Sequence, residues 1–143
     1  MDKFYFIVKE AHSGIAYLAI FALVIAIINA VSGIASKKEF AKKDKTISLV
    51  AFIISHIQLL VGLILYFVSP LGFAQLGNMS DGAMRLTSLE HPLVNIIAIV
   101  LITVGWSKHK KVAGNEKFKK IAVFYALGLI LILSRIPYAS WLS

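Results

Sequence analysis

The sequence predicts an all-α, polytopic membrane protein: a bundle of four transmembrane helices that run up, down, up and down. Hydrophobic residues make up 59% of the 143 residues and charged residues only 15%, whereas soluble domains have roughly 45–50% and about 25%. The mean hydropathy is +0.82. The apolar residues form four blocks, and most of the lysines lie in two of the links between them. A soluble domain of this size could not bury so much apolar surface.

The four blocks cover about 12–35, 46–68, 91–107 and 121–141 of one domain, 1–143. Each approaches the length of about 20 apolar residues that a spanning helix needs. In lipid a segment must satisfy its own backbone hydrogen bonds, so these blocks are expected to be helices. The first block is too long for the apolar core of a signal peptide. Pro92 fits the first turn of a helix that begins near Glu90 or His91, or it kinks a helix that begins earlier.

The distribution of positive charge predicts the orientation. Link 37–45 contains five lysines and link 108–120 contains six, whereas the N-terminal segment and link 71–90 contain only Lys3, Lys9 and Arg85. Lys-rich links face the cytoplasm, so both termini are expected to face outward, into the periplasm of a bacterium with this protein in its inner membrane. The net charge of +8 therefore reflects topology and contact with the lipid bilayer, and not a nucleic-acid partner. The chain has no cysteine, which excludes disulfides and thiolate sites.

Ionisable groups inside the blocks are the candidate functional residues, because they are rare and costly in lipid. His56 lies in the middle of the second block, His12 and His91 begin the first and third, and Arg135 lies in the fourth. Imidazoles on separate helices of a bundle are the usual axial ligands of heme iron. The predicted cofactor is therefore heme b, with Arg135 as the cation that pairs with its propionates.

The predicted depths rank the ligand pairs. At 1.5 Å per residue from the cytoplasmic ends, His56 and His91 differ by about 9 Å in depth, and His12 and His91 differ by about 12 Å. His56 with His91 is therefore the first choice of metal ligands, and His12 with His91 the second. Glu90, Gln58 and Asn95 are the expected groups around the ligands, where they would orient the imidazoles.

A long stretch also resembles a known family. The segment His56-Ile-Gln-Leu-Leu-Val-Gly-Leu-Ile-Leu-Tyr-Phe-Val-Ser-Pro70 is similar to small four-helix membrane proteins of Bacteroidetes labelled "cytochrome B", as are His12, Arg85 to His91, and Arg135-Ile-Pro137. The resemblance implies a membrane b-type heme protein with His12, His56, Glu90 and His91 at the matching positions. Pro92 departs from the family pattern. The layout is more distantly similar to cytochrome b561-type bundles, without their paired histidines on two helices.

The expected function is electron transfer by a heme-containing inner-membrane protein or subunit, linked to a quinone and without substrate chemistry of its own. Three alternatives stay open. The chain could be a non-catalytic subunit or assembly factor of a larger membrane complex or a homo-oligomer, in which the histidines only pack. It could hold a metal at its outer face through Glu10, His12, Glu90 and His91. It could be a small transporter, although its carboxylates lie outside or at the edges of the blocks.

Overall fold

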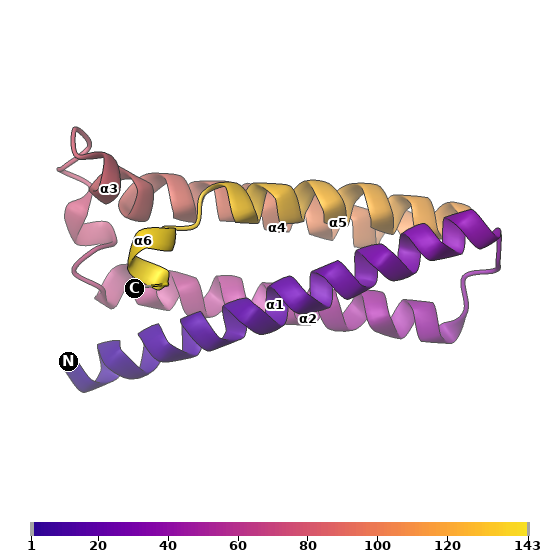
Figure 1. The fold of residues 1–143 in the computed structure, drawn as a ribbon, viewed down its shortest axis with the longest axis horizontal. Helices are drawn as coiled ribbons and strands as arrows, with labels where there is room; N and C mark the ends of the chain where they lie inside the picture. The colour runs from indigo at the N-terminus through magenta and orange to yellow at the C-terminus, as the bar shows by residue number, and fades with distance from the viewer. Residues whose placement is uncertain (1, 143) are drawn as a thin grey trace.

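The computed structural model describes residues 2–142, and all of its regular elements in that range are helical. Four long helices lie side by side: α1 (Asp2–Ser36), α2 (Lys42–Val68), α4 (His91–His109) and α5 (Glu116–Ser134) (Figure 1). Four short elements complete the fold: η1 (Phe73–Gln75), α3 (Gly82–Arg85), η2 (Leu86–Glu90) and α6 (Tyr138–Trp141). The all-helical class predicted from the sequence is confirmed.

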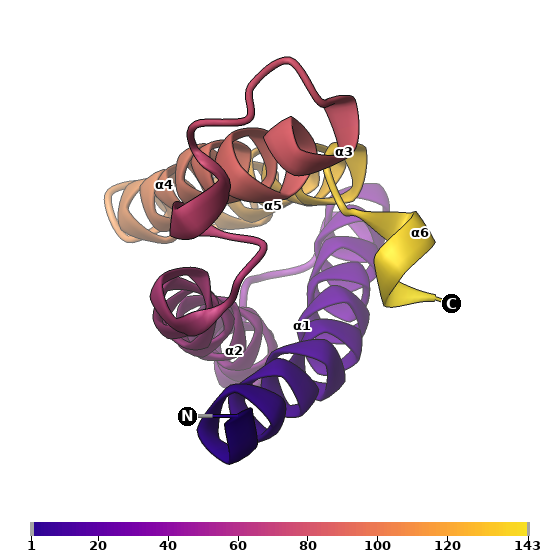
Figure 2. The ribbon, with the colours of Figure 1, turned by 90° about the vertical axis from the view of Figure 1, so that its left-hand side faces the viewer.

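The long helices form a bundle in which α1 packs on α2 and α5, and α4 packs on α5 and α2. Both ends of the chain lie at one end of the bundle, and the link between α1 and α2 lies at the other (Figure 1). Helix α1 crosses the bundle obliquely. Viewed along the bundle from the end that holds the termini, α6 lies beside α1 (Figure 2).

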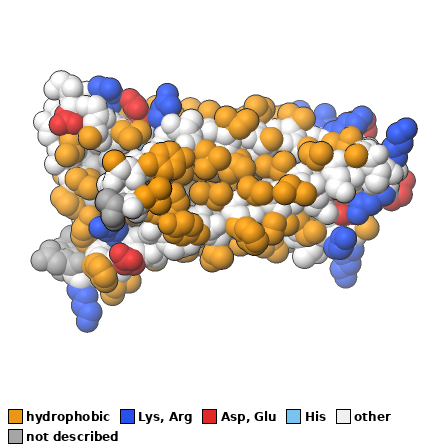
Figure 3. Space-filling view, viewed as in Figure 1, with side chains coloured by type: hydrophobic (Ala, Val, Ile, Leu, Met, Phe, Trp, Pro, Cys, Tyr) orange, Lys and Arg blue, Asp and Glu red, His pale blue; other side chains and the backbone are white. Residues whose placement is uncertain are grey.

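Three helical segments are long and apolar enough to cross a membrane: Lys3–Ser36, Lys42–Val68 and Gly82–His109. Large apolar side chains cover the outside of the bundle (Figure 3), among them Phe21, Phe67 and Ile130, which are 64%, 65% and 62% exposed. Such a surface is suited to the hydrocarbon of a bilayer. Helix α5 is not among the three segments, because its first turns carry Glu116 and several lysines.

The end of the fourth block differs from the expectation. Helix α5 ends at Ser134, and not at Trp141, because the backbone leaves the helical conformation at Arg135 (φ −130°, ψ 30°). Pro137 explains the break, since proline has no N–H for the helix and restricts the residue before it. Arg135 therefore lies just beyond a helix and not within one, and the last residues turn back as α6.

Helix α4 begins at His91 with Pro92 in its first turn, as in the first of the two possibilities, and it continues directly from α3 and η2 in one helical segment, Gly82–His109. Asp81 caps α3 by accepting hydrogen bonds from the N–H groups of Ala83 and Met84, and the wider turn η2 joins α3 to α4. Pro92 cannot donate to the carbonyl of Ser88, four residues earlier. The hydroxyl of Tyr66 donates to that carbonyl instead, at 2.8 Å, so α2 stabilises the irregular turn.

At the Lys-rich end, a buried carboxylate joins α1 to α2. The side chain of Asp44 is fully buried. It accepts hydrogen bonds from Asn29 Nδ2 at 3.0 Å and from the N–H of Ala41 at 2.8 Å, and Lys38 Nζ lies 3.3 Å from it. Next to it, Tyr125 of α5 is buried and donates to the carbonyl of Ser48 at 2.9 Å. This end of the bundle is therefore fixed by polar contacts as well as by apolar packing.

Glycines allow α4 and α5 to approach closely. A Cβ on Gly128 would lie 2.7 Å from Ile102 Cγ1 and 3.1 Å from the carbonyl oxygen of Ala98. The second of these atoms belongs to the backbone and cannot rotate away. Small residues at helix crossings are the common means of packing in membrane bundles.

We therefore expect Gly128→Leu to force α4 and α5 apart and to destabilise the protein by about 1–3 kcal/mol. Unfolding in detergent, followed by circular dichroism, measures the effect. Gly14→Leu is the matched control, because a Cβ at Gly14 meets nothing within 4 Å. Equal stability of the two variants would contradict the close contact.

Candidate functional site

A cavity of about 430 Å³ lies toward the end of the bundle that holds the termini. Its walls come from α1, α2, α4 and the segment that follows α5, and most of its surface is apolar. Four of the lining residues have small side chains, which leaves space for a flat group to pack: Ala16, Ala19, Ser55 and Gly62. The volume falls in the range of small-molecule sites, about 300–1,000 Å³.

Two of the three candidate ligands meet at this cavity. His12 of α1 and His91 of α4 both line it, and their ring centroids lie 6.2 Å apart with the ring planes at 77°. This is the pair that the sequence ranked second. The oblique course of α1 (Figure 1) shortens its rise along the bundle, which brings His12 closer in depth to His91 than a count of residues indicates.

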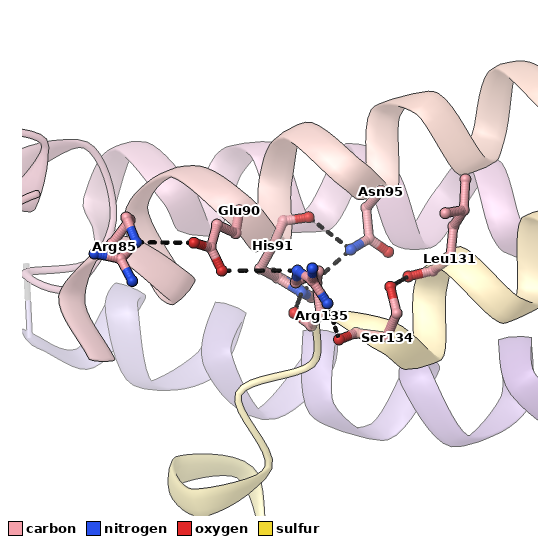
Figure 4. Close-up of polar contacts among 7 residues, drawn as sticks. All are labelled: Arg85, Glu90, His91, Asn95, Leu131, Ser134 and Arg135. Atoms are coloured by element: carbon pink, nitrogen blue, oxygen red, sulfur yellow. Dashed lines mark hydrogen bonds and ion pairs between the residues drawn. The ribbon is translucent and has the colours of Figure 1, made fainter. Parts of the chain in front are cut away.

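His91 is held in one orientation and one tautomer. Its Nδ1 lies 2.9 Å from the carbonyl oxygen of Arg135. A carbonyl only accepts hydrogen bonds, so Nδ1 carries the proton and Nε2 keeps a free lone pair. Asn95 Nδ2 donates to the carbonyl of His91 at 2.6 Å (Figure 4). This arrangement is typical of a histidine that binds a metal through Nε2.

The imidazole of His12 is packed but incompletely bonded. Its Nδ1 is buried and has no hydrogen-bond partner within residues 2–142. Gln58 of α2 donates to the carbonyl of His12 at 2.8 Å, while its own Oε1 is also buried without a partner there. A Cβ on Gly62 would lie 2.9 Å from His12 Cε1. Gly62 therefore makes room for the imidazole ring of His12, and the buried Nδ1 of that ring has no hydrogen-bond partner among the described residues.

His56, the other member of the first-choice pair, does not join this group. Its Nδ1 lies 2.7 Å from the carbonyl of Phe52, and its Nε2 lies 3.0 Å from Thr103 Oγ1. Both ring nitrogens are thus engaged: Nδ1 bonds within α2, and Nε2 joins α2 to α4. His56 is not among the residues that line the cavity.

The charged residues form a separate cluster near His91. Glu90 pairs with two arginines (Figure 4): Arg85 Nε lies 2.9 Å from its Oε2, and Arg135 Nε lies 3.7 Å from its Oε1. The side chain of Arg135 is 48% exposed. Its guanidinium therefore keeps free donors, and two positive charges face a single carboxylate.

Helix α6 closes the cavity, which the sequence did not predict. Trp141 Nε1 donates to Ser13 Oγ at 2.7 Å, and the ring of Trp141 packs on Tyr17 with centroids 4.8 Å apart. Both partners lie in α1, more than a hundred residues earlier. The sequence placed Trp141 at the end of the fourth block, and no local pattern indicated this contact.

A metal site made by side chains alone is not formed. Within the described part of the chain, no three or more His, Cys, Asp and Glu side chains come together as a metal ion would require. The outer-face site expected from Glu10, His12, Glu90 and His91 is therefore not seen, because Glu90 is paired with arginines. The imidazoles of His12 and His91 do meet. Two protein ligands are enough to hold a metal ion only where another group supplies the remaining ligands.

A heme would supply such remaining ligands, and His12 and His91 are the residues that would hold it. Imidazoles from separate helices of a bundle are its usual ligands, and these two ring centroids lie 6.2 Å apart. The buried, unpartnered nitrogen of His12, the fixed tautomer of His91 and the apolar walls are consistent with the same group.

Comparison with protein-family models, with curated proteins and with solved structures finds no match to this chain. The side chains of the site therefore carry the information about function.

Proposed function

We propose that this chain is a membrane electron-transfer protein that binds heme b between His12 and His91. The observation that carries the proposal is the juxtaposition of these two imidazoles, 6.2 Å apart on separate helices, at an apolar cavity. Bound heme supplies one-electron redox chemistry. His56, ranked first from the sequence, has a structural role in this proposal, because both of its ring nitrogens are already bonded.

The surrounding residues have distinct roles in this proposal. The carbonyl of Arg135 accepts the Nδ1 proton of His91, which leaves the Nε2 lone pair free and raises the basicity of the ring. Asn95 and Gln58 hold the backbone at His91 and His12. Arg135 does not line the cavity, but its guanidinium lies near His91 (Figure 4) and would pair with a cofactor carboxylate at the cavity's edge. Glu90 keeps Arg85 and Arg135 together.

We further propose that all four long helices span the inner membrane of a bacterium, with the Lys-rich links in the cytoplasm and both termini in the periplasm. The clustering of eleven lysines in links 37–45 and 108–120 supports this orientation. The proposed site then lies toward the periplasmic side. A quinone is the proposed redox partner, because it is soluble in the same bilayer as the site.

The decisive experiment is an optical spectrum of the purified protein, expressed with an ample supply of heme. The proposal predicts a reduced-minus-oxidised difference spectrum with an α band at about 560 nm, as is typical of b-type heme with two nitrogen ligands. The same protein expressed without heme supply, and then titrated with heme, should acquire the band. Absence of the band under both conditions would refute the proposal.

The orientation can be tested separately, because the chain has no natural cysteine. In intact cells a membrane-impermeant maleimide should label Lys3→Cys and leave Lys43→Cys and Lys111→Cys unlabelled. All three should react after the cells are lysed. Labelling of Lys43→Cys in intact cells would show that the orientation is the reverse.

Enlarging Gly62 should weaken heme binding without removing a ligand. Gly62→Val places a branched side chain where a Cβ alone already lies 2.9 Å from His12 Cε1. His12 would then have to leave its present position, so we expect about 10–100-fold weaker heme binding, the usual effect of disturbing the support of a ligand. Titration of the apoprotein with heme measures this. Gly77→Val is the control, since a Cβ there meets nothing within 4 Å.

A further inference from the structure

A second hollow, of about 410 Å³, lies at the opposite end of the bundle from the proposed heme site. It is formed where the link between α1 and α2 meets the link between α4 and α5. Its lining combines four lysines with two rings: Lys42, Lys45, Lys110, Lys117, His109 and Phe40.

None of the four lysines that line this hollow forms an ion pair within the described part of the chain. None of its lining residues is acidic. Two carboxylates are next to lining residues in the sequence. Asp44 is buried and bound to Asn29, Ala41 and Lys38. Glu39 is exposed and lies beside Gly114, without an ion pair to any lysine of the hollow among the described residues. Glu116 pairs with Lys119, which does not line the hollow. Several ammonium groups around one space attract an anion with several oxygen acceptors.

Two of the lysines are positioned by neighbouring groups. Lys117 Nζ donates to the carbonyl of His109 at 2.9 Å. Lys110 Nζ lies 5.1 Å from the ring centroid of Trp106, which is within the range of a cation–π contact. The ring of Trp106 also packs on His109, with centroids 4.5 Å apart. The rings of Phe40 and His109 thus line the hollow together with the lysines, and Trp106 packs directly behind His109.

The hollow lies at the ends of two candidate membrane spans, where a bilayer would place its lipid phosphates. The candidate span α2 begins at Lys42, and the one that contains α4 ends at His109, and both residues line the hollow. About two to three helical turns further along the same helices, Ile53 and Val100 are 45% and 54% exposed. A phosphate bound among the lysines could therefore be attached to acyl chains that lie along α2 and α4.

We propose that this hollow binds the phosphate of an acidic phospholipid. Basic pockets between helices on the cytoplasmic side of a membrane are suited to such headgroups. Free phosphate offers the same oxygens, but it does not gain from the apolar surface beside the hollow. This site is independent of the heme proposal, because it shares no residue with the cavity near His12 and His91.

The test uses Trp106 as a reporter. The chain has two tryptophans, so a Trp141→Phe background leaves only Trp106 to fluoresce. This protein is placed in nanodiscs that contain an equal fraction of brominated phosphatidylglycerol or brominated phosphatidylcholine. Quenching is expressed relative to the unbrominated lipid with the same headgroup, which cancels effects of charge on the emission. We expect stronger quenching of Trp106 by brominated phosphatidylglycerol.

Matched variants identify the site. Lys42→Gln with Lys110→Gln removes two lysines that line the hollow, and Lys43→Gln with Lys111→Gln removes their neighbours, which do not. Each lysine near a lipid headgroup contributes about fivefold in affinity, so the first pair should lower the preference for phosphatidylglycerol about 25-fold. The second pair should leave most of the preference intact.

Two outcomes would overturn the proposal. Equal quenching by the two brominated lipids, or an equal loss of preference in both double variants, would show a general charge effect and no site. If inorganic phosphate added to phosphatidylcholine nanodiscs changes Trp106 emission in the parent and in Lys43→Gln/Lys111→Gln, but not in Lys42→Gln/Lys110→Gln, the hollow binds soluble phosphate and not a lipid.

Discussion

Replacing either His12 or His91 by alanine is expected to remove the low-spin heme spectrum, and His56→Ala is expected to preserve it. The ring centroids of the two cavity histidines lie 6.2 Å apart, so either substitution deletes one of the two proposed iron ligands. The ring nitrogens of His56 bond to Phe52 and Thr103 instead. We expect heme affinity to fall by at least about 100-fold in the first two variants, more than the loss of a supporting group costs. The α band per mole of protein, at fixed heme, measures this.

Chemical rescue separates a lost ligand from a misfolded protein. The His12→Ala variant leaves a space beside Gly62 and the cavity, and added imidazole can enter it. Imidazole should therefore restore the α band in His12→Ala, and circular dichroism should show the same helix content in all three variants. If His56→Ala loses the band while His12→Ala keeps it, the pair ranked first from the sequence is the correct one, and the assignment to His12 fails.

Loss of the Asp44 side chain is expected to cause the largest fall in stability of any single polar substitution in the Lys-rich half. Asp44→Ala leaves Asn29 Nδ2 and the N–H of Ala41 without their acceptor in a fully buried position. It also leaves Lys38 without its carboxylate. Removing one partner of buried hydrogen-bonded charges costs about 3–5 kcal/mol, far more than the pair itself contributes.

Chemical unfolding in detergent, followed by circular dichroism, tests this expectation. Glu116→Ala is the control, because Glu116 is 54% exposed and pairs only with Lys119; exposed pairs of this kind contribute about 0.2–1 kcal/mol. The stability of Asp44→Asn should lie between those of the other two variants. Its amide keeps one oxygen acceptor, but its NH2 group lies near Asn29 Nδ2 and the N–H of Ala41, which are also donors. A similar stability of Asp44→Ala and Glu116→Ala would contradict the role of Asp44 as the link between α1 and α2.

The burial of Asp44 could not be predicted from the sequence. In the sequence it lies among five lysines, in a link that appears solvated. In the structure it is buried, because the chain turns back after α1 and brings Asn29 over the first turn of α2. Nothing in the local pattern distinguishes this carboxylate from Glu39 or Glu116, since the contact partner is fifteen residues away.

The sequence alone determined the helical class, the approximate positions of the long helices, the separation of a Lys-rich end from the other end and the choice of histidines as candidates. These properties depend on composition and on the length of apolar blocks, which are local. Only the tertiary structure decided that His12 meets His91, that His56 bonds elsewhere and that α6 closes the cavity with Trp141. These contacts depend on the tilt of α1 and on how the chain turns back after Pro137 ends the helical path of α5. Neither feature can be derived from the spacing of residues along one helix.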